Sequence, residues 1–451
     1  MIRWGVSAGT HDASLCVMHD DNVVFASSSE RFSRIKNDKH LNQQIVDYAL
    51  QWGYPDEVIW YENPILKAFR KIYAGQDNVW LNPTSYMKQY GIKRRVKYNK
   101  HHKSHAAGGF YTSGFDDAIV IVIDAIGEWT TMSVWDNMEC IHESKYPDSL
   151  GLFYSAATAA VGLKPNEDEY ILMAMAAYGE IYIPEIAELR HTNLHRGFKS
   201  TERKVDIALT AQIVFEQELE QILQKYNYKQ NVVFSGGCAL NCVANRLLYK
   251  YFDNVWIMPN PGDSGSALGC LLDHHIEWTG PYLGYDVGDV DDTDKIVDYI
   301  IEHKVCGLVN GKAEFGPRAL GNRSLLADIS VTKEELNNIK QRQNFRPFAP
   351  VILEEEYDNY FEGHATPYMQ VVSKCKSYVE SITNVDGTSR VQTVNRKQNS
   401  VLYDILKQYF ERTGIPMLIN TSLNIKGMPI VNNIEDAMMF ENTHKIKVFY
   451  P

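Results

Sequence analysis

The chain has 451 residues, which is enough for two or three domains with an ample core. Charged residues make up 22% of it and hydrophobic residues 45%, as in an ordinary soluble globular protein. The formal net charge of −11 argues against general binding to nucleic acids or anionic membranes, and no apolar stretch reaches membrane-spanning length.

The cysteines and the first residues bear on the compartment. The seven cysteines are an odd, scattered set, and the start of the chain lacks a signal-peptide pattern. Both features favour a reduced, cytoplasmic setting. Cys238 and Cys242 lie four residues apart, but no second cysteine pair completes a zinc site, so buried apolar cysteines are the better interpretation.

Two segments of the first half share one pattern. Residues 5–25 and residues 120–141 each predict a strand, a polar turn, a strand, an Asp-Asn turn and a third strand, at an offset of 117 residues. This duplication predicts two similar α/β lobes that face each other across a cleft, with His11 and Glu128 at equivalent turns. Two unrelated hairpins are the alternative.

The elements that follow predict a domain boundary near residue 280. Residues 205–227 have helical periodicity, and a buried strand then leads through a glycine turn into another helix. Gly280 and Pro281 open an acidic connection. We therefore expect three parts: a duplicated domain over 1–280, a linker over 281–300 and a second α/β domain over 301–451.

Four residues could bind one divalent metal ion. His101 and His105 share one face of a predicted helix. Asp124 ends a buried apolar strand, where a lone carboxylate is costly, and Asp263 lies in a turn between a strand and a helix. Two imidazoles and two carboxylates suit iron(II), manganese or zinc with open positions for catalysis. Exposed helical histidines and simple turn aspartates are the alternatives.

Two glycine turns could hold a phosphate. Gly236 and Gly237 follow a predicted strand and open a helix, and residues 262–269 repeat this arrangement. Backbone N–H groups at such a turn can approach a phosphate closely, helped by the helix dipole. Neither turn has the Gly-Lys-Ser/Thr of a Walker loop, and a tight strand-to-helix turn is the simpler interpretation of each alone.

A basic cluster lies beyond the boundary. Arg318 stands in a segment rich in turn formers, and Lys340, Arg342 and Arg346 follow soon after. Arginines among apolar residues and prolines favour the binding of phosphate or carboxylate oxygens. Interdomain salt bridges are the alternative.

Taken in order, the motifs of the chain resemble those of the NodU/CmcH/TobZ family of O-carbamoyltransferases, from the first turn to the end of the chain. The motifs include Gly9-Thr10-His11-Asp12, His101-His102-Lys103-Ser104-His105-Ala106, Phe234-Ser235-Gly236-Gly237-Cys238-Ala239-Leu240-Asn241, Phe315-Gly316-Pro317-Arg318-Ala319-Leu320-Gly321-Asn322-Arg323-Ser324 and Phe345-Arg346-Pro347-Phe348-Ala349-Pro350. The order makes the resemblance specific.

The resemblance implies an α/β protein in which duplicated actin-like (ASKHA, Kae-type) lobes precede a YrdC-like α/β domain. It implies that the YrdC-like part converts carbamoyl phosphate and ATP, with Mg²⁺, into carbamoyl-adenylate. The duplicated part would then transfer the carbamoyl group to a hydroxyl of a small molecule, such as a sugar, an antibiotic-like compound or a nucleoside. A divalent metal, expected to be Fe(II), would lie beside this reaction.

The resemblance also assigns roles to matching positions. His101, His105, Asp124 and Asp263 become metal ligands, and His11 becomes the general base. The residues that contact the adenylate would be Gly236, Gly237 and Asn241. The residues that hold the triphosphate and carbamoyl phosphate would be Lys340, Arg346, Arg318, Arg342, Arg390 and Ser422, with Lys340 and Arg346 acting in catalysis.

Several positions depart from the family pattern. Asp168 replaces a glycine, Ile171 a lysine, Gln343 a glutamate and Asn384 a histidine. The chain is also shorter than typical members, mostly between residues 180 and 230. We expect acceptor recognition to differ accordingly.

Two other functions fit the sequence less well. A tRNA threonylcarbamoyl-type transferase is disfavoured by the acidic net charge and the lack of a basic arm, so a nucleic-acid partner is not expected. A non-catalytic ATP-binding sensor of the actin-like type is disfavoured because both the metal-type residues and the basic cluster are present. The sequence leaves the acceptor open, and it leaves the oligomeric state open as well, with a homodimer as one option.

Overall fold

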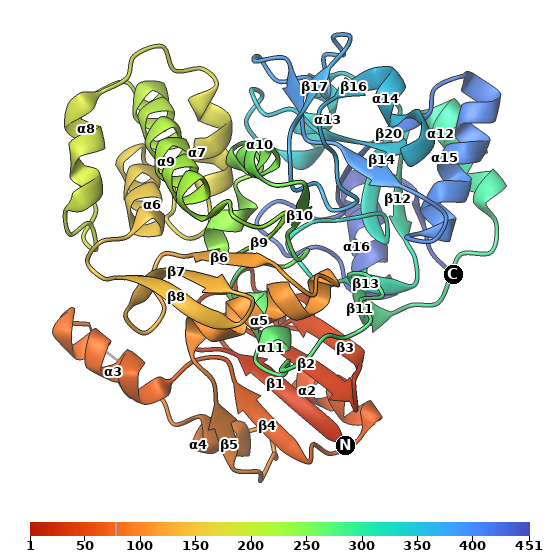
Figure 1. Ribbon diagram of the computed structural model, residues 1–451. Coiled ribbons are helices and arrows are strands. Elements are labelled where there is room, and N and C mark those ends of the chain that lie inside the picture. The colour runs from red at the N-terminus through yellow and green to blue at the C-terminus, as the bar shows by residue number, and fades with distance from the viewer. Residues whose placement is uncertain (77–78) are drawn as a thin grey trace. The chain divides into compact units, whose positions relative to one another are not determined.

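The computed structural model describes residues 1–76 and 79–451. The chain folds into two compact units, both of α/β type (Figure 1). The first unit contains Met1–Ser33 and Asn37–Trp278, and the second contains Arg34–Lys36 and Thr279–Pro451. In the described part of the chain, no helix has both the length and the apolar composition that crossing a membrane requires.

The first unit contains two five-stranded sheets with the same topology. Their strand orders are β3-β2-β1-β4-β5 and, read in the same direction, β8-β7-β6-β9-β10. In each sheet the first three strands in chain order are antiparallel neighbours, and the last two run parallel to the first. The strands of the first sheet are β1 (Ile2–Ser7), β2 (Ser14–His19), β3 (Asn22–Ser28), β4 (Glu57–Trp60) and β5 (Val96–Tyr98). Those of the second are β6 (Ile119–Ile123), β7 (Thr130–Asp136), β8 (Glu139–Lys145), β9 (Asn231–Ser235) and β10 (Asn254–Trp256).

This repeated topology confirms the duplication that the sequence predicts. The predicted offset holds because β8 begins 117 residues after β3, at Glu139 against Asn22. The central strand β6 is a continuous apolar run that is fully buried, as expected for a strand covered on both faces. Its carboxyl end therefore brings Asp124 to the interior of the unit.

Two helices pack against each other between the sheets. Helix α5 (His101–Ser113) lies on β6 and β9, and helix α11 (Ser266–Gly269) lies on β1 and β2 (Figure 1). The two helices approach closely because Gly269 has no side chain: a Cβ there would lie 1.9 Å from the carbonyl oxygen of Ser104. This contact holds the turn before α11 against the histidine-bearing face of α5.

Other helices of the first unit build a core beside the second sheet or lie on its periphery. Helix α9 packs on α6 and α7, and Phe153, Phe215 and Leu219 lie fully buried in the same core. The helices are α1 (Glu30–Ser33), α2 (Gln43–Ala49), α3 (Pro64–Tyr73), α4 (Pro83–Lys88), α6 (Leu150–Ala160), α7 (Glu169–Ala176), α8 (Pro184–Glu188), α9 (Lys204–Tyr226) and α10 (Leu248–Tyr251).

The second unit is built on a six-stranded mixed sheet of order β19-β15-β20-β14-β12-β21. These strands are β12 (Val305–Val309), β14 (Arg323–Ala327), β15 (Ala349–Leu353), β19 (Gln392–Val394), β20 (Met417–Ser422) and β21 (Val448–Phe449). Smaller sheets are formed by β11 (Tyr282–Asp286) with β13 (Lys312–Glu314), and by β16 (Phe361–Glu362), β17 (Ser373–Cys375) and β18 (Thr388–Ser389). The helices are α12 (Thr293–His303), α13 (Lys333–Lys340), α14 (Tyr357–Tyr360), α15 (Ser400–Thr413) and α16 (Ile434–His444).

The segment predicted as a linker, 281–300, has regular structure. It holds β11 and most of α12. Helix α12 is amphipathic, and its buried residues Ile296, Val297 and Ile300 join the core formed with α15 and β12. The acidic residues of this segment mark its solvent-facing side, and the segment belongs to the second unit.

Candidate metal centre and basic site

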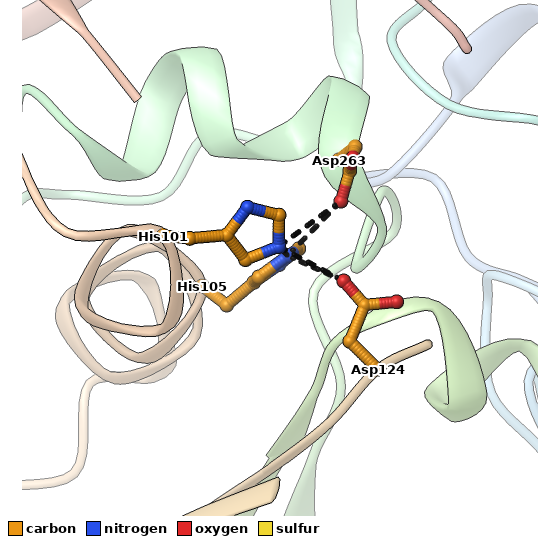
Figure 2. A group of neighbouring side chains, drawn as sticks. All are labelled: His101, His105, Asp124 and Asp263. Carbon is orange, nitrogen blue, oxygen red and sulfur yellow. Dashed lines mark hydrogen bonds and ion pairs between the residues drawn. The ribbon is translucent and has the colours of Figure 1, made fainter. Parts of the chain in front are cut away.

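Four residues predicted from the sequence converge inside the first unit (Figure 2). His101 and His105 lie one turn apart on α5, Asp124 follows β6, and Asp263 begins the short 3-10 turn Asp263–Gly265 before α11. One side-chain ligand atom of each residue lies within 4.8 Å of those of the others. All four side chains are shielded from solvent, since none is more than 12% exposed.

The spacing of these atoms fits a single cation. The Nε2 atoms of His101 and His105 are 3.1 Å apart. Asp124 Oδ2 lies 2.9 Å and 3.3 Å from these two nitrogens, and Asp263 Oδ1 lies 3.4 Å and 3.3 Å from them. Donor atoms about 2.1 Å from one ion lie about 3.0–3.4 Å from each other. A set of two nitrogens and two oxygens suits iron(II), manganese or zinc.

The outer contacts of His105 leave its Nε2 available to a metal. His105 Nδ1 lies 3.0 Å from the carbonyl oxygen of Pro261, to which it donates. A proton on Nδ1 leaves the lone pair on Nε2, which points at the cluster. The same carbonyl accepts the N–H of Gly236 at 2.9 Å, so the two predicted glycine turns lie against each other at this point.

Glu128 positions the start of α5. The residue before the helix, Lys100, provides no side-chain cap. Instead, Glu128 Oε1 accepts the backbone N–H of His101 at 3.0 Å and that of Asn63 at 2.7 Å. A carboxylate at a helix N-terminus satisfies unpaired donors and interacts favourably with the helix dipole. Glu128, from the turn after β6, therefore supports the start of the helix that carries both histidines.

Electrostatic interactions between the two histidines and the two aspartates shift the pKa values of these groups. Burial lowers the pKa of His101, but Asp263 and Asp124 outweigh burial and hold that pKa well above its usual value. The same two carboxylates raise the pKa of His105 against burial. Burial raises the pKa of Asp263, but the histidines hold it well below its usual range. Protons on the imidazoles and a divalent cation are thus alternative ways to neutralise Asp124 and Asp263.

The first turn of the chain reaches this cluster through Thr10. Thr10 Oγ1 donates to Asp263 Oδ2 at 3.3 Å, which places the next residue, His11, close by. His11 is 37% exposed, and its Nδ1 lies 3.1 Å from Asp12 Oδ2. Burial lowers the pKa of His11, but the bond to Asp12 and the charge of Asp263 raise it to about 9. At neutral pH His11 becomes a base only when those acidic charges are compensated.

The glycine turn after β9 is shaped by packing. Gly236 has a φ of +89°, and a Cβ there would lie 2.2 Å from the carbonyl oxygen of Ile123. A Cβ on Gly237 would lie 3.0 Å from Asp124 Oδ1. These contacts explain why residue 236 has no side chain, and they set Asp124 against the turn. Asn241 is buried, and its side chain bonds Gln212 at 3.0 Å and the backbone N–H of Ala244 at 3.1 Å.

In the second unit the structure brings Lys340 and Ser422 together. Lys340 Nζ donates to the carbonyl oxygen of Ser422 and to Asn424 Oδ1, each at 2.5 Å. The guanidinium of Arg342 lies 3.6 Å from the centre of the Phe348 ring. Burial, together with the charges of Arg342 and Arg346, lowers the pKa of Lys340 to about 7. Perturbed pKa values of this kind are common at functional sites.

The other predicted basic residues lie on loops of the same unit. Arg346 Nη1 donates to Gln343 Oε1 at 3.4 Å, so the residue that replaces the family glutamate contacts a predicted catalytic arginine. Arg318 follows β13, Arg390 follows β18, and both are partly exposed. Asn424, which had no assigned role, bonds Lys340 through its side chain.

Sequence reasoning missed two buried charged residues beside His101. Glu62 follows β4 and lies 3% exposed, with its Oε2 3.6 Å from His101 Nδ1. Lys67 Nζ donates to the other carboxylate oxygen of Glu62. A partial signal was present, since Glu62 lies shortly after a strand, as Asp124 does, although that strand is only half-buried.

The fold and the two sites define a two-part α/β protein with a buried His₂Asp₂ cluster in one part and a basic cluster in the other. Residues 297–450 match the family model described as Carbamoyltransferase C-terminus. Residues 61–211 and 188–272 match the model described as Carbamoyltransferase N-terminus. The chain therefore belongs to the carbamoyltransferase family, which confirms the resemblance noted in its motifs. It is a transferase, as the sequence predicts, and not the non-catalytic sensor that was the disfavoured alternative.

Relatives with similar sequences match over nearly the whole chain. An uncharacterized protein of Synechocystis sp. is 31% identical, with 96% of this chain and 93% of the relative covered. An uncharacterized protein of Methanocaldococcus jannaschii is 32% identical, with 95% and 94% covered. A 3'-hydroxymethylcephem-O-carbamoyltransferase of Amycolatopsis lactamdurans is 28% identical, with 95% and 94% covered.

Proposed function

We propose that this protein is an ATP-dependent O-carbamoyltransferase that carbamoylates a hydroxyl group of a small molecule. The convergence of His101, His105, Asp124 and Asp263 in the first unit carries this proposal, because it provides a site for a divalent ion inside a carbamoyltransferase fold. The similarity to a cephem O-carbamoyltransferase supports transfer to oxygen. The acceptor would be a hydroxylated small molecule such as a sugar, an antibiotic-like compound or a nucleoside.

The first half-reaction activates the carbamoyl group. A carbamate is a poor acyl donor because its nitrogen deactivates the carbonyl. Water releases phosphate and carbamate from carbamoyl phosphate. A carbamate oxygen then attacks the α-phosphorus of ATP, pyrophosphate leaves, and carbamoyl-adenylate remains. We assign this half-reaction to the second unit, taken as a YrdC-like domain.

The basic residues of the second unit suit this chemistry. Activation brings several anionic oxygens together, and Lys340, Arg342 and Arg346 would hold them. Arg318, Arg390 and Ser422 would complete the binding of the triphosphate and carbamoyl phosphate. Mg²⁺ would accompany ATP. An amine whose ammonium form has a pKa near 7 takes up a proton when an anion binds, so Lys340 can become charged as the ligand arrives.

The second half-reaction would take place in the first unit. The acceptor oxygen attacks the carbamoyl carbon, and AMP leaves. His101, His105, Asp124 and Asp263 would hold a divalent ion, taken to be Fe(II), and Gly236, Gly237 and Asn241 would contact the adenylate. When bound, the ion would supply Lewis-acid stabilisation of developing negative charge. His11 would take the acceptor hydroxyl proton on its ring nitrogen, because it is accessible and lies beside the cluster.

A product assay tests this function. The full-length protein is incubated with ATP, carbamoyl phosphate, Mg²⁺ and Fe(II), and with a panel of hydroxylated metabolites. We expect AMP and pyrophosphate in equal amounts, and an acceptor whose mass increases by one carbamoyl group. A carbamoylated acceptor formed without consumption of ATP would contradict the proposal, and so would carbamoylation at nitrogen.

A further inference from the structure

Glu62 faces the side of His101 that points away from the four-residue cluster. Its Oε2 lies 3.6 Å from His101 Nδ1, while His101 Nε2 faces Asp124, Asp263 and His105. Within the described residues, His101 Nδ1 is buried and makes no hydrogen bond. A buried N–H without an acceptor is costly, so this nitrogen needs a partner.

The structure fixes Glu62 relative to α5. The residue after Glu62, Asn63, donates its backbone N–H to Glu128 Oε1, and the same oxygen accepts the N–H of His101. Glu128 thus joins the segment that carries Glu62 to the first residue of the helix. Only a few tenths of an ångström of side-chain movement would convert the 3.6 Å separation into a hydrogen bond.

Lys67 compensates the charge of Glu62. Its Nζ donates to Glu62 Oε1, and both residues are at least 90% buried as side chains. The Glu62–Lys67 pair is therefore neutral overall, and the net charge of the site remains that of Asp124 and Asp263. Glu62 can therefore accept the Nδ1–H of His101 without adding net negative charge to the metal site.

We propose that Glu62 is a positioning residue of the metal centre, which accepts the Nδ1–H of His101 and so directs the Nε2 lone pair at the cation. This inference rests on the metal site of the proposed function. The two histidines would then differ, because His105 donates to the neutral carbonyl of Pro261 whereas His101 donates to a carboxylate. Carboxylate acceptors make an imidazole a stronger ligand, so His101 would bind the ion more tightly.

Two double variants separate the hydrogen bond from the charge. Glu62→Leu with Lys67→Met removes the acceptor and both charges together. Glu62→Gln with Lys67→Met also removes both charges but keeps an amide oxygen that accepts more weakly. Replacement of a buried ion pair by apolar residues of similar size is often neutral for stability, so we expect both variants to fold. Asp206→Asn is the control, because Asp206 is equally buried but bonds the backbone N–H of Glu180 and Ile181.

The measurement is a Co²⁺ titration of the metal-free, full-length protein, followed by visible absorption, with circular dichroism to verify folding. We expect Co²⁺ to bind about 10–100-fold more weakly to the Leu/Met variant, with a changed absorption spectrum. The Gln/Met variant should fall between it and the wild type, and Asp206→Asn should match the wild type. If the Leu/Met variant does not fold, the Gln/Met variant decides.

The outcomes distinguish a failure of the metal site from a failure of the role assigned to Glu62. Wild-type protein that binds no Co²⁺ overturns the metal site and this inference with it. Wild-type protein that binds Co²⁺ no more tightly than the folded double variants, with the same spectrum, leaves the metal site standing and overturns the role of Glu62. Equal weakening in Asp206→Asn would also overturn it, because any lost buried carboxylate would then have the same effect.

Discussion

The Nε2 atoms of His101 and His105 lie 3.1 Å apart, and both imidazoles are buried on the same helix. Two N–H groups cannot donate to each other at this separation, so each nitrogen must turn to Asp124, to Asp263 or to a shared cation. Asp124 and Asp263 close the other side of the same space. The arrangement is thus suited to a divalent ion, and the neighbouring His102 lies outside it.

The two half-reactions should respond to different substitutions. We expect His105→Ala to abolish acceptor carbamoylation while pyrophosphate still forms from ATP and carbamoyl phosphate. His102→Gln is the matched control, because His102 is also buried on α5 but bonds Ser133 Oγ at 2.8 Å. Lys340→Ala should stop adenylate formation first. Equal loss of both half-reactions in His105→Ala would contradict the division of labour.

The metal-free protein should be most stable in mildly acidic solution. The pKa values of His101 and His105 are raised, so their protonated forms stabilise the fold below about pH 6.5, and this stability is lost as pH rises through the raised values. The pKa values of Asp124 and Asp263 are lowered, so their contribution is present above about pH 4. Urea unfolding at pH 5.5 and pH 8.5 measures the free energy of unfolding.

We expect a smaller free energy of unfolding at pH 8.5 than at pH 5.5, and a smaller difference when Zn²⁺ is bound in place of the protons. A double variant, His101→Gln with His105→Gln, should lack most of the alkaline decline. Metal-free wild-type protein that is equally stable at both pH values would show that these histidines are not held in their charged forms.

Anion binding to the second unit should take up a proton. Because the pKa of Lys340 is lowered to about 7, its amine is mostly neutral at pH 8 in the free protein. Bound phosphate oxygens favour the ammonium, so binding should take up close to one proton. Calorimetric titration with carbamoyl phosphate at pH 8, in two buffers of different ionisation enthalpy, counts it. Lys340→Arg should bind without this uptake; buffer-independent heats in the wild type would contradict the assignment.

The turn after β9 should not tolerate a side chain at Gly236. An alanine there would require a left-handed backbone and would collide with the carbonyl oxygen of Ile123. We expect Gly236→Ala to destabilise the fold by about 2–4 kcal/mol. Gly262→Ala is the control, because its φ is −80° and the nearest atom to a Cβ lies 3.9 Å away. Thermal and urea unfolding of both variants measure the difference, and equal stability would contradict the packing argument.

The sequence could predict the features that depend on local pattern. The turn signals and apolar runs predicted the duplicated strands, and a spacing of four predicted that His101 and His105 share a helix face. The apolar residues Ile296 and Ile300 lie among acidic residues, so the helical pattern of α12 was not recognised and its segment was predicted as a linker. The contact between Glu62 and His101 depends on how β4 and α5 pack, and no local pattern contains that information. The side chain of Asn241 likewise bonds Gln212, a partner from a distant helix.

The most direct test of the account is anomalous diffraction at the iron edge from crystals of the full-length protein grown or soaked anaerobically with Fe(II). We expect one strong anomalous peak among the side chains of His101, His105, Asp124 and Asp263, and its loss in His105→Ala. An iron-loaded crystal with no peak among these four side chains, or with the same peak in His105→Ala, would contradict it.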